Sequence, residues 1–199
     1  MNNIELRGKI TNIQPSHTIG NIVFNKATLL VPHKDKEDVI SLKFREKDNP
    51  YKEGDEIAIT GNIRSYSYQV GGGKNKVDIY VFTHFDQPEN ITDNVNNVVI
   101  SGRICKIEEL HKLKNGGCNL HFILANNIDI ANKDLRLNSY IPCISWGKLA
   151  KEMSSLSVNT NLEITGQIHS REHIKRLENG DAIIRVAHEL HVSSYKVIE

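Results

Sequence analysis

The sequence predicts an all-β protein that contains two copies of one small barrel, and three observations support this prediction. Extended runs of alternating apolar and polar residues recur through the 199 residues, five in each half. Residues 2–10 recur as 96–104, and residues 57–65 recur as 162–170. Gly166 lies inside the last of these segments and indicates a bend or a close backbone approach, as at a barrel corner. Together these features predict two tandem OB-folds, which are five-stranded Greek-key barrels.

The expected strands follow the alternation in chain order. In the first copy we expect strands near residues 3–13, 21–31, 38–45, 55–68 and 76–85. In the second copy we expect strands near residues 97–107, 118–128, 139–146, 160–174 and 181–195. The connections are rich in glycine, asparagine and lysine, which suits long hairpin turns.

The two copies differ after their third strand. Residues 148–156 have room for two helical turns, so we expect a short helix there. The corresponding residues 46–54 form a shorter segment that a proline interrupts, so we expect a loop. Residues 86–95 are polar, contain a proline and mark the boundary between the copies. We therefore expect an N-terminal domain at 1–88 and a C-terminal domain at 95–199.

Charge and cysteine content narrow the class of protein. Lys and Arg number 25 against 24 Asp and Glu, which argues against a protein that coats polyanions but leaves room for a local positive groove. Cys105, Cys118 and Cys143 form no C-x-x-C pair, so we expect free thiols in a reducing cytoplasm. The sequence has no apolar run of membrane-spanning length and no signal-peptide core, so we expect a cytoplasmic protein.

Rings and cations on the outer strand faces are the candidate functional residues. Single-stranded nucleic acid is held by a positive groove and by rings on which bases stack, each stack contributing about 1–3 kcal/mol. Arg64, Tyr66 and Tyr68 alternate with the apolar residues of the fourth run and therefore face solvent. Packing of tyrosines across a sheet surface is the alternative interpretation. The second copy has, at the equivalent places, His169, Arg171 and His173.

The third runs add further candidate rings. Tyr140 and Trp146 share a strand face, and we expect Phe44 to be the first-copy equivalent of Trp146. A place in the barrel core or in an interface is the alternative for Trp146, because Ile144 shares its face. The cations near these rings are expected to contact phosphates, namely Lys43, Arg45, Lys74, Lys76, Arg103, Lys114 and Lys148.

Five short motifs occur together in the second copy. They are Asn96-Asn97-Val98 with Gly102-Arg103-Ile104, Asn115-Gly116-Gly117, Phe122-Ile123-Leu124-Ala125, Trp146-Gly147-Lys148-Leu149-Ala150, and Gly166-Gln167-Ile168-His169-Ser170-Arg171. In this order and spacing, residues 96–195 resemble the bacterial single-stranded-DNA-binding protein (SSB) family. The first copy is connected to that family mainly through the internal repeat.

The resemblance implies an OB-fold protein that binds single-stranded DNA without strong sequence preference in replication, recombination and repair. It implies base stacking at Tyr140 and Trp146, and it aligns Tyr68 and His173 with a common stacking position. Near Ile130, where the family often has another stacking tryptophan, this sequence has none. Typical members assemble four OB-folds, so the resemblance implies a homodimer. The chain ends without the family's acidic tail, so we expect a specialised member, such as a plasmid- or phage-encoded protein.

Signatures of an enzyme are weak. The H-E-x-H segment that starts at His188 lies in a strand pattern, which places its two histidines on opposite faces. His169 and His173 share a face but lie about 13 Å apart on an extended strand, too far apart to chelate one ion. The sequence has no P-loop and no G-x-S-x-G. We therefore expect no catalysis, metal, cofactor, small-molecule substrate or membrane partner.

Two alternative functions remain open at this point. The first is an OB-fold protein directed at RNA or at the primosome, which still uses rings and cations. The second is a protein-interaction module whose barrel face binds no nucleic acid. The near-zero net charge favours the second, whereas Arg64, Tyr66, Tyr68 and Trp146 oppose it.

Overall fold

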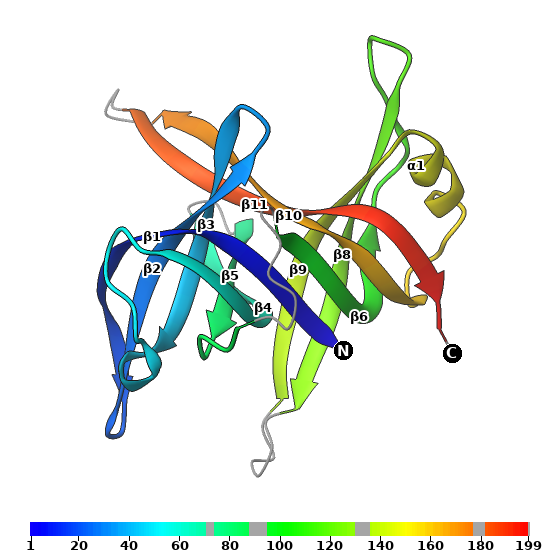
Figure 1. Cartoon of the computed structure of the whole chain (residues 1–199). Coiled ribbons are helices and arrows are strands. Elements are labelled where there is room, and N and C mark those ends of the chain that lie inside the picture. The colour runs from blue at the N-terminus through cyan, green and yellow to red at the C-terminus, as the bar shows by residue number, and fades with distance from the viewer. Residues whose placement is uncertain (71–73, 88–94, 130–135, 177–181, 199) are drawn as a thin grey trace.

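Strands dominate the computed structural model, which describes residues 1–70, 74–87, 95–129, 136–176 and 182–198 (Figure 1). The strands of the first half are β1 (Asn2–Ile19), β2 (Ile22–His33), β3 (Lys36–Arg45), β4 (Glu56–Val70) and β5 (Lys74–Thr83). Those of the second half are β6 (Asn96–Ile107), β7 (His111–Lys112), β8 (Cys118–Asp129), β9 (Arg136–Trp146), β10 (Asn161–Arg176) and β11 (Ala182–Val197). The predicted all-β class is confirmed. The two-residue strand β7 was not expected.

Each half closes into a barrel through the same set of pairings. In the first half, β1 pairs with β2 and β4, and β3 pairs with β2 and, in parallel, with β5. The antiparallel pair β4–β5 completes the ring. In the second half, β6, β8, β9, β10 and β11 repeat this arrangement, with β9 and β11 as the parallel pair. The tandem OB-fold prediction is therefore confirmed.

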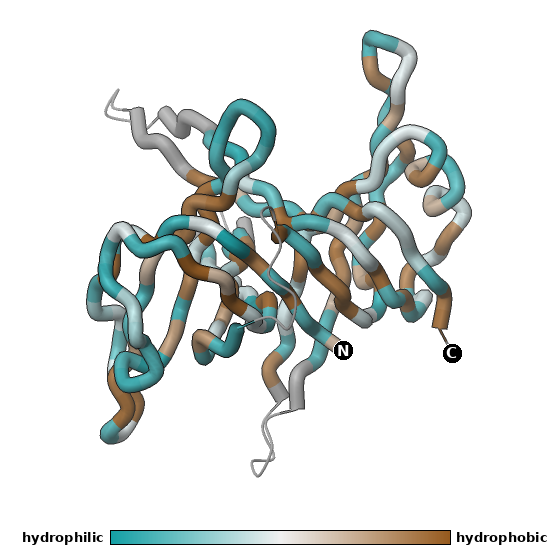
Figure 2. The backbone as a smooth tube through the Cα atoms, viewed as in Figure 1, coloured by the Kyte–Doolittle hydropathy of each residue, from teal (hydrophilic) through white to brown (hydrophobic). Residues whose placement is uncertain are grey.

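The core lies inside the barrels because the strands alternate. Figure 2 shows brown and teal segments alternating along much of the chain, and most apolar positions of β1, β3 and β4 are buried, whereas Ile19 at the end of β1 is exposed. The second barrel is covered at one end by the predicted helix α1 (Gly147–Met153), which buries Ala150 and Met153. In the first barrel the same connection is a loop with one short 3₁₀ turn (Glu46–Asp48), and Tyr51 from this loop packs on Phe85 at 5.5 Å.

One antiparallel ladder joins the two barrels. β1 and β6 lie side by side in Figure 1, with Ile4 opposite Val98 at the centre of the ladder. Asn2 pairs with Ile100 and Leu6 pairs with Asn96. Since residues 2–10 are the repeat equivalents of residues 96–104, this register is self-complementary. The two barrels are thus related by an approximate twofold axis through the ladder.

An asparagine at the start of each copy connects the ladder strand to another strand of the same barrel by hydrogen bonds. The Asn2 side chain accepts from the backbone N–H of Ile63 at 2.9 Å and donates to the carbonyl of the same residue at 2.8 Å. Asn96 makes the equivalent pair of hydrogen bonds with Ile168, at 3.0 and 2.7 Å. The two copies therefore preserve this contact as well as their strand order.

The remaining fold observations concern helices and cysteines. No helix in the described ranges is long and apolar enough to span a membrane. All three cysteines are free, with Cys118 and Cys143 buried and Cys105 exposed. Burial raises the pKa of the Cys143 thiol far above its usual value.

The close approach predicted at Gly166 is present. A Cβ atom added at this glycine would lie 2.2 Å from the backbone oxygen of His191, and the β10–β11 register shifts between Thr165 and Gly166. Gly61, its repeat equivalent, has a Cβ position 2.7 Å from the backbone oxygen of Phe82. Neither position can accept a side chain without moving the neighbouring strand.

We therefore expect Gly166→Ala to lower the free energy of unfolding by about 1–3 kcal/mol, the usual cost of overpacking. Urea denaturation followed by circular dichroism would measure this change. Gly117→Ala is the matched control, because its Cβ would meet only side-chain atoms, at 3.2 and 3.4 Å. Equal stability of the two variants would contradict the close strand approach at Gly166.

Candidate nucleic-acid interface

Three tyrosines and a lysine gather on the outer face of the first barrel. Tyr66 and Tyr68 of β4 have ring centroids 5.9 Å apart, and Tyr80 of β5 lies 6.2 Å from Tyr66. The Lys43 ammonium of β3 lies 4.9 Å from the Tyr66 ring centroid and 4.2 Å from that of Tyr80. Burial and the neighbouring Lys26 lower the pKa of Lys43. We call Lys43, Tyr66, Tyr68 and Tyr80 the tyrosine face.

A second row of rings continues this surface across the barrel. Arg64 of β4 stacks on Phe82 of β5, with its guanidinium carbon 3.9 Å from the ring centroid. Phe82 lies 6.3 Å from Phe24 of β2, and Phe24 stacks on His17 at 4.8 Å. Burial lowers the pKa of Arg64, although nearby Tyr80 acts in the opposite direction. Rings and cations therefore extend from the β1–β2 hairpin to the β4–β5 hairpin.

Several of these rings were not among the candidates from sequence. Tyr80 and Phe82 occupy alternate positions of β5, opposite in phase to the core residues Ile79 and Val81, and Phe82 is itself only 8% exposed beneath the Arg64 guanidinium. The period of two could have identified them. No comparable signal marks Phe24, because its neighbours Ile22 and Val23 are exposed apolar residues.

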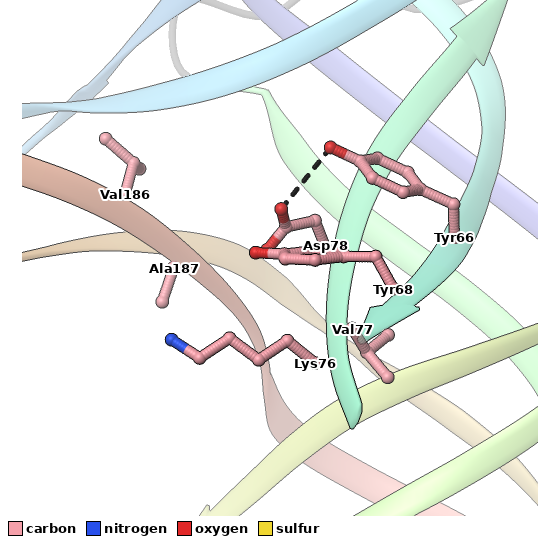
Figure 3. Close-up of a pocket in the computed structure, with 7 residues that line it drawn as sticks. All are labelled: Tyr66, Tyr68, Lys76, Val77, Asp78, Val186 and Ala187. Atoms are coloured by element: carbon pink, nitrogen blue, oxygen red, sulfur yellow. Dashed lines mark hydrogen bonds between the residues drawn. The ribbon is translucent and has the colours of Figure 1, made fainter. Parts of the chain in front are cut away.

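A groove runs along the tyrosine face and is closed on one side by the second barrel. Its main cavity has a volume of about 590 Å³ and is lined by Tyr66, Tyr68 and Lys76 together with Val186 and Ala187 of β11. Figure 3 shows these side chains and the hydrogen bond, 3.3 Å long, that the Tyr66 hydroxyl donates to Asp78. A neighbouring cavity of about 310 Å³ shares Tyr66, Asp78 and Val186 and extends past Lys43. The groove therefore draws on both copies of the unit.

The phenol groups in this groove keep their protons. Burial and the nearby Asp78 carboxylate raise the pKa of Tyr66 above its usual value. Burial also raises the pKa of Tyr80, although the Arg64 guanidinium opposes that change. Both rings are thus neutral, half-exposed surfaces beside charged ammonium and guanidinium groups.

The second barrel presents its own exposed rings. Trp146 is 44% exposed and Tyr140 is 39% exposed, whereas Ile144 between them is buried. The Trp146 ring lies 6.1 Å from that of His191 on β11. Lys148 follows on α1 with its side chain 93% exposed and its ammonium 3.6 Å from Glu152. The expected surface position of Trp146, rather than the alternative of a core position, agrees with this geometry.

Phe44 does not belong to the surface. It is fully buried and packs edge-on against Phe85 at 4.7 Å. Its predicted equivalence to Trp146 is also wrong. In the parallel pairing of each barrel, Leu42 pairs with Val81 on β5 and Cys143 pairs with Leu190 on β11, so Leu42 and Cys143 are the equivalent positions. This register places Arg45, and not Phe44, at the position of Trp146. Phe44 is therefore a core residue and not a stacking ring.

His169 also departs from the expectation. Its side chain is only 11% exposed, and its Nδ1 atom lies 2.7 Å from the Asp38 carboxylate of the first barrel. The ring stacks on His33 at 4.2 Å. His169 therefore lies between the two barrels, where no base can stack on it, because neighbouring side chains cover its ring.

The remaining predicted cations have varied surroundings. Arg45 is engaged with Asp48 and His84, and Arg171 lies 3.2 Å from Glu189 while remaining exposed. Arg103 and Lys114 are exposed. The side chains of His173 and Lys74 lie outside the described part of the structure.

Comparisons with known proteins bear on both halves of the chain. The profile of the "Single-strand binding protein family" matches residues 95–196. "Single-stranded DNA-binding protein 1" of Streptococcus pyogenes serotype M18 is 30% identical over 107 residues, which cover 53% of this chain and 79% of that protein.

Solved structures resemble the whole chain. The wild-type single-stranded DNA binding protein from Thermus aquaticus has a TM-score of 0.72 and 15% identity, covering 100% of this chain and 93% of that one. A deletion mutant of the same protein gives a TM-score of 0.72, 16% identity and coverages of 100% and 95%. At this level of identity the likeness concerns the fold.

The different positions of Phe44 and Tyr66 lead to different effects on stability. We expect Phe44→Ala to lower the free energy of unfolding by about 3–5 kcal/mol, because it leaves a cavity in the core. Tyr66 is 47% exposed, so Tyr66→Ala should lower the free energy of unfolding by about 1 kcal/mol or less. Urea denaturation of both variants checks this, and a Phe44→Ala protein as stable as the wild type would contradict the core assignment.

Proposed function

Because this chain belongs to the single-strand binding protein family, we propose that it binds single-stranded DNA by base stacking and phosphate contacts, without strong sequence preference. Its cellular role would be the one general to that family, the protection of exposed strands in replication, recombination and repair. An intracellular location, where such strands arise, is part of this proposal. The function needs no catalytic step.

The tyrosine face is the observation that carries the proposal for the first barrel. Half-exposed rings of Tyr66 and Tyr68 offer flat surfaces to bases of any sequence, since every base has a π-face. Lys43 lies against the rings of Tyr66 and Tyr80, and Lys76 lines the same groove. Ammonium groups beside stacked bases are placed to contact the phosphates that link them. Asp78 repels phosphate and would keep the strand on the lysine side of the groove.

The second barrel would extend the binding path. Trp146 and Tyr140 are its exposed rings, and Lys148 supplies a solvent-exposed ammonium two residues after Trp146. Arg103 and Lys114 add exposed positive charge in the same barrel. Contacts are thus available in both barrels, which supports a binding site that spans them.

We expect an oligo-dT of about thirty nucleotides to quench the fluorescence of Trp146, the single tryptophan of the chain. The affinity should fall as salt rises, because phosphate contacts release counterions. Fluorescence titration at two salt concentrations measures both effects. Absence of binding at low salt would eliminate the proposal and favour the protein-interaction alternative. Tighter binding of a matched RNA oligomer than of the DNA oligomer would favour the alternative of an RNA-directed protein.

Variants of the tyrosine face complete this test. Tyr66→Ala and Tyr68→Ala should each weaken binding by about 1–3 kcal/mol, a factor of about 5 to 150, if a base stacks on each ring. Tyr66→Phe is the matched control, because it keeps the ring and removes only the hydroxyl that bonds Asp78. Fluorescence anisotropy of labelled oligo-dT reports the affinities. Unchanged affinity in both alanine variants would remove the tyrosine face from the binding site.

We further propose that two chains associate to give four barrels, as the resemblance to the SSB family implies. Light scattering should then give twice the mass of one 22.5 kDa chain. A mass that stays at one chain over a wide range of protein concentration would contradict the dimer. DNA binding by a single chain would remain compatible with that result.

A further inference from the structure

Two histidines and one aspartate meet between the two barrels. His33 ends β2, Asp38 lies on β3, and His169 comes from β10 of the second barrel. Their three potential ligand atoms all lie within 4.8 Å of one another. The Asp38 Oδ2 atom is 2.7 Å from Nδ1 of His169 and 3.2 Å from Nδ1 of His33. We call these residues the interdomain histidine cluster.

The cluster is buried at its centre and has an unsatisfied nitrogen. The Asp38 side chain is fully buried and accepts a hydrogen bond of 2.7 Å from the Ser170 backbone N–H. His33 Nδ1 is a buried atom without a hydrogen-bond partner, although the Asp38 oxygen lies nearby. A buried ring nitrogen that lacks a hydrogen-bond partner and lies 3.2 Å from a buried carboxylate oxygen is a position where a bound proton or cation would satisfy both groups.

Asp38 is the anionic member of the cluster. Burial opposes ionisation of Asp38, but hydrogen bonds from Ser170 and His169 outweigh it, so the pKa of this carboxyl lies below its usual value. Burial and then the charge of His169 lower the pKa of His33. Metal binding requires a carboxylate and neutral imidazoles, so an ion would displace any proton held at a ligand nitrogen.

We propose that the interdomain histidine cluster binds one Zn²⁺ ion through Nδ1 of His33, Nδ1 of His169 and Oδ2 of Asp38. Ligand atoms at about 2.0–2.2 Å from one tetrahedral ion lie about 3.3 Å from each other, so shifts within the side chains suffice. Two imidazoles and a carboxylate are a donor set that zinc accepts, whereas Mg²⁺ and Ca²⁺ prefer oxygen alone.

The surroundings provide access and a support for the rings. A cavity of about 310 Å³ is lined by His33 and His169 together with Lys34, Asn96 and Gln167, so an ion would reach the buried ligand atoms by a small movement of these rings and a water from the cavity would fill the fourth position. On the other side, His191 packs edge-on against His169 at 4.5 Å. Burial and the nearby His169 lower the pKa of His191 to about 4, so this third imidazole adds no positive charge at neutral pH.

A bound ion would connect the two barrels through side chains. His33 and Asp38 flank the β2–β3 turn, where His33 pairs with Lys36, and His169 belongs to the other barrel. Zinc binding would therefore fix the β2–β3 hairpin against β10 and stabilise the folded chain by mass action. This inference is independent of DNA binding, since none of the three ligands belongs to the tyrosine face.

The test uses the full chain after removal of metals with a chelator. Titration with Co²⁺ should give the visible absorption of a tetrahedral ion, saturating at one equivalent, and Zn²⁺ should abolish that absorption. Zn²⁺ should also raise the melting temperature. His33→Gln should weaken Zn²⁺ binding by more than about 100-fold, since loss of even an indirect partner of a metal ligand costs about 10–100-fold.

Controls separate this site from weak surface binding, because the chain has nine histidines. His111→Gln, at an exposed histidine of β7, should bind Zn²⁺ as the wild type does. Asp38→Asn keeps an oxygen that can accept the hydrogen bond from the Ser170 N–H, so this variant should remain folded when the chelator is present. Circular dichroism checks the folding. The same variant should lose Zn²⁺ binding. Equal Zn²⁺ affinity in wild type, His33→Gln and Asp38→Asn, or no tetrahedral Co²⁺ spectrum, would overturn the proposal and leave a hydrogen-bonded contact without metal.

Discussion

The antiparallel ladder between β1 and β6 is the contact on which the arrangement of the two barrels depends. Its centre at Ile4 and Val98 coincides with the axis that relates the copies, so each strand presents equivalent positions of the repeat to its partner. Asn2 and Asn96 add side-chain hydrogen bonds to the backbone on each side. Removal of one of these asparagine side chains would leave backbone groups without a hydrogen bond and lower the free energy of unfolding by about 1–3 kcal/mol. This ladder places β3 of the first barrel beside β10 and places β4 beside β9.

The two secondary contacts created in this way share a backbone pattern and differ in chemistry. Ser65 of β4 accepts a hydrogen bond from the Tyr140 N–H at 2.7 Å, and its repeat equivalent Ser170 accepts one from the Val39 N–H at 2.8 Å. Arg64 stacks on Phe82 beside the first contact, whereas the second contains the interdomain histidine cluster. Divergence of a few side chains has therefore placed a ring surface on one side of the axis and a candidate metal site on the other.

The groove at the tyrosine face is also a product of the paired arrangement. The hairpin of β10 and β11 extends from the second barrel across the first (Figure 1), and Val186 and Ala187 of β11 form one wall. A single barrel would expose Tyr66 and Tyr68 on an open sheet surface. In the pair, the same rings line a cavity in which a strand has protein on two sides. Tandem duplication thus changes the shape of the binding surface without changing the fold of either unit.

Sequence alone determined the repeat, the ten main strands, the short helix and the outward position of Tyr66, Tyr68 and Trp146. These features follow from local alternation, since a period of two tells which residues share a strand face. It does not tell what covers that face. For this reason only the tertiary structure decided that the neighbouring barrel encloses His169. The core position of Phe44, in contrast, agrees with the alternation, because Phe44 is in phase with Ile40 and Leu42. The histidine cluster combines residues up to 136 positions apart in the chain, and no local pattern records such a contact, which arises because the β1–β6 ladder brings two separate barrels together.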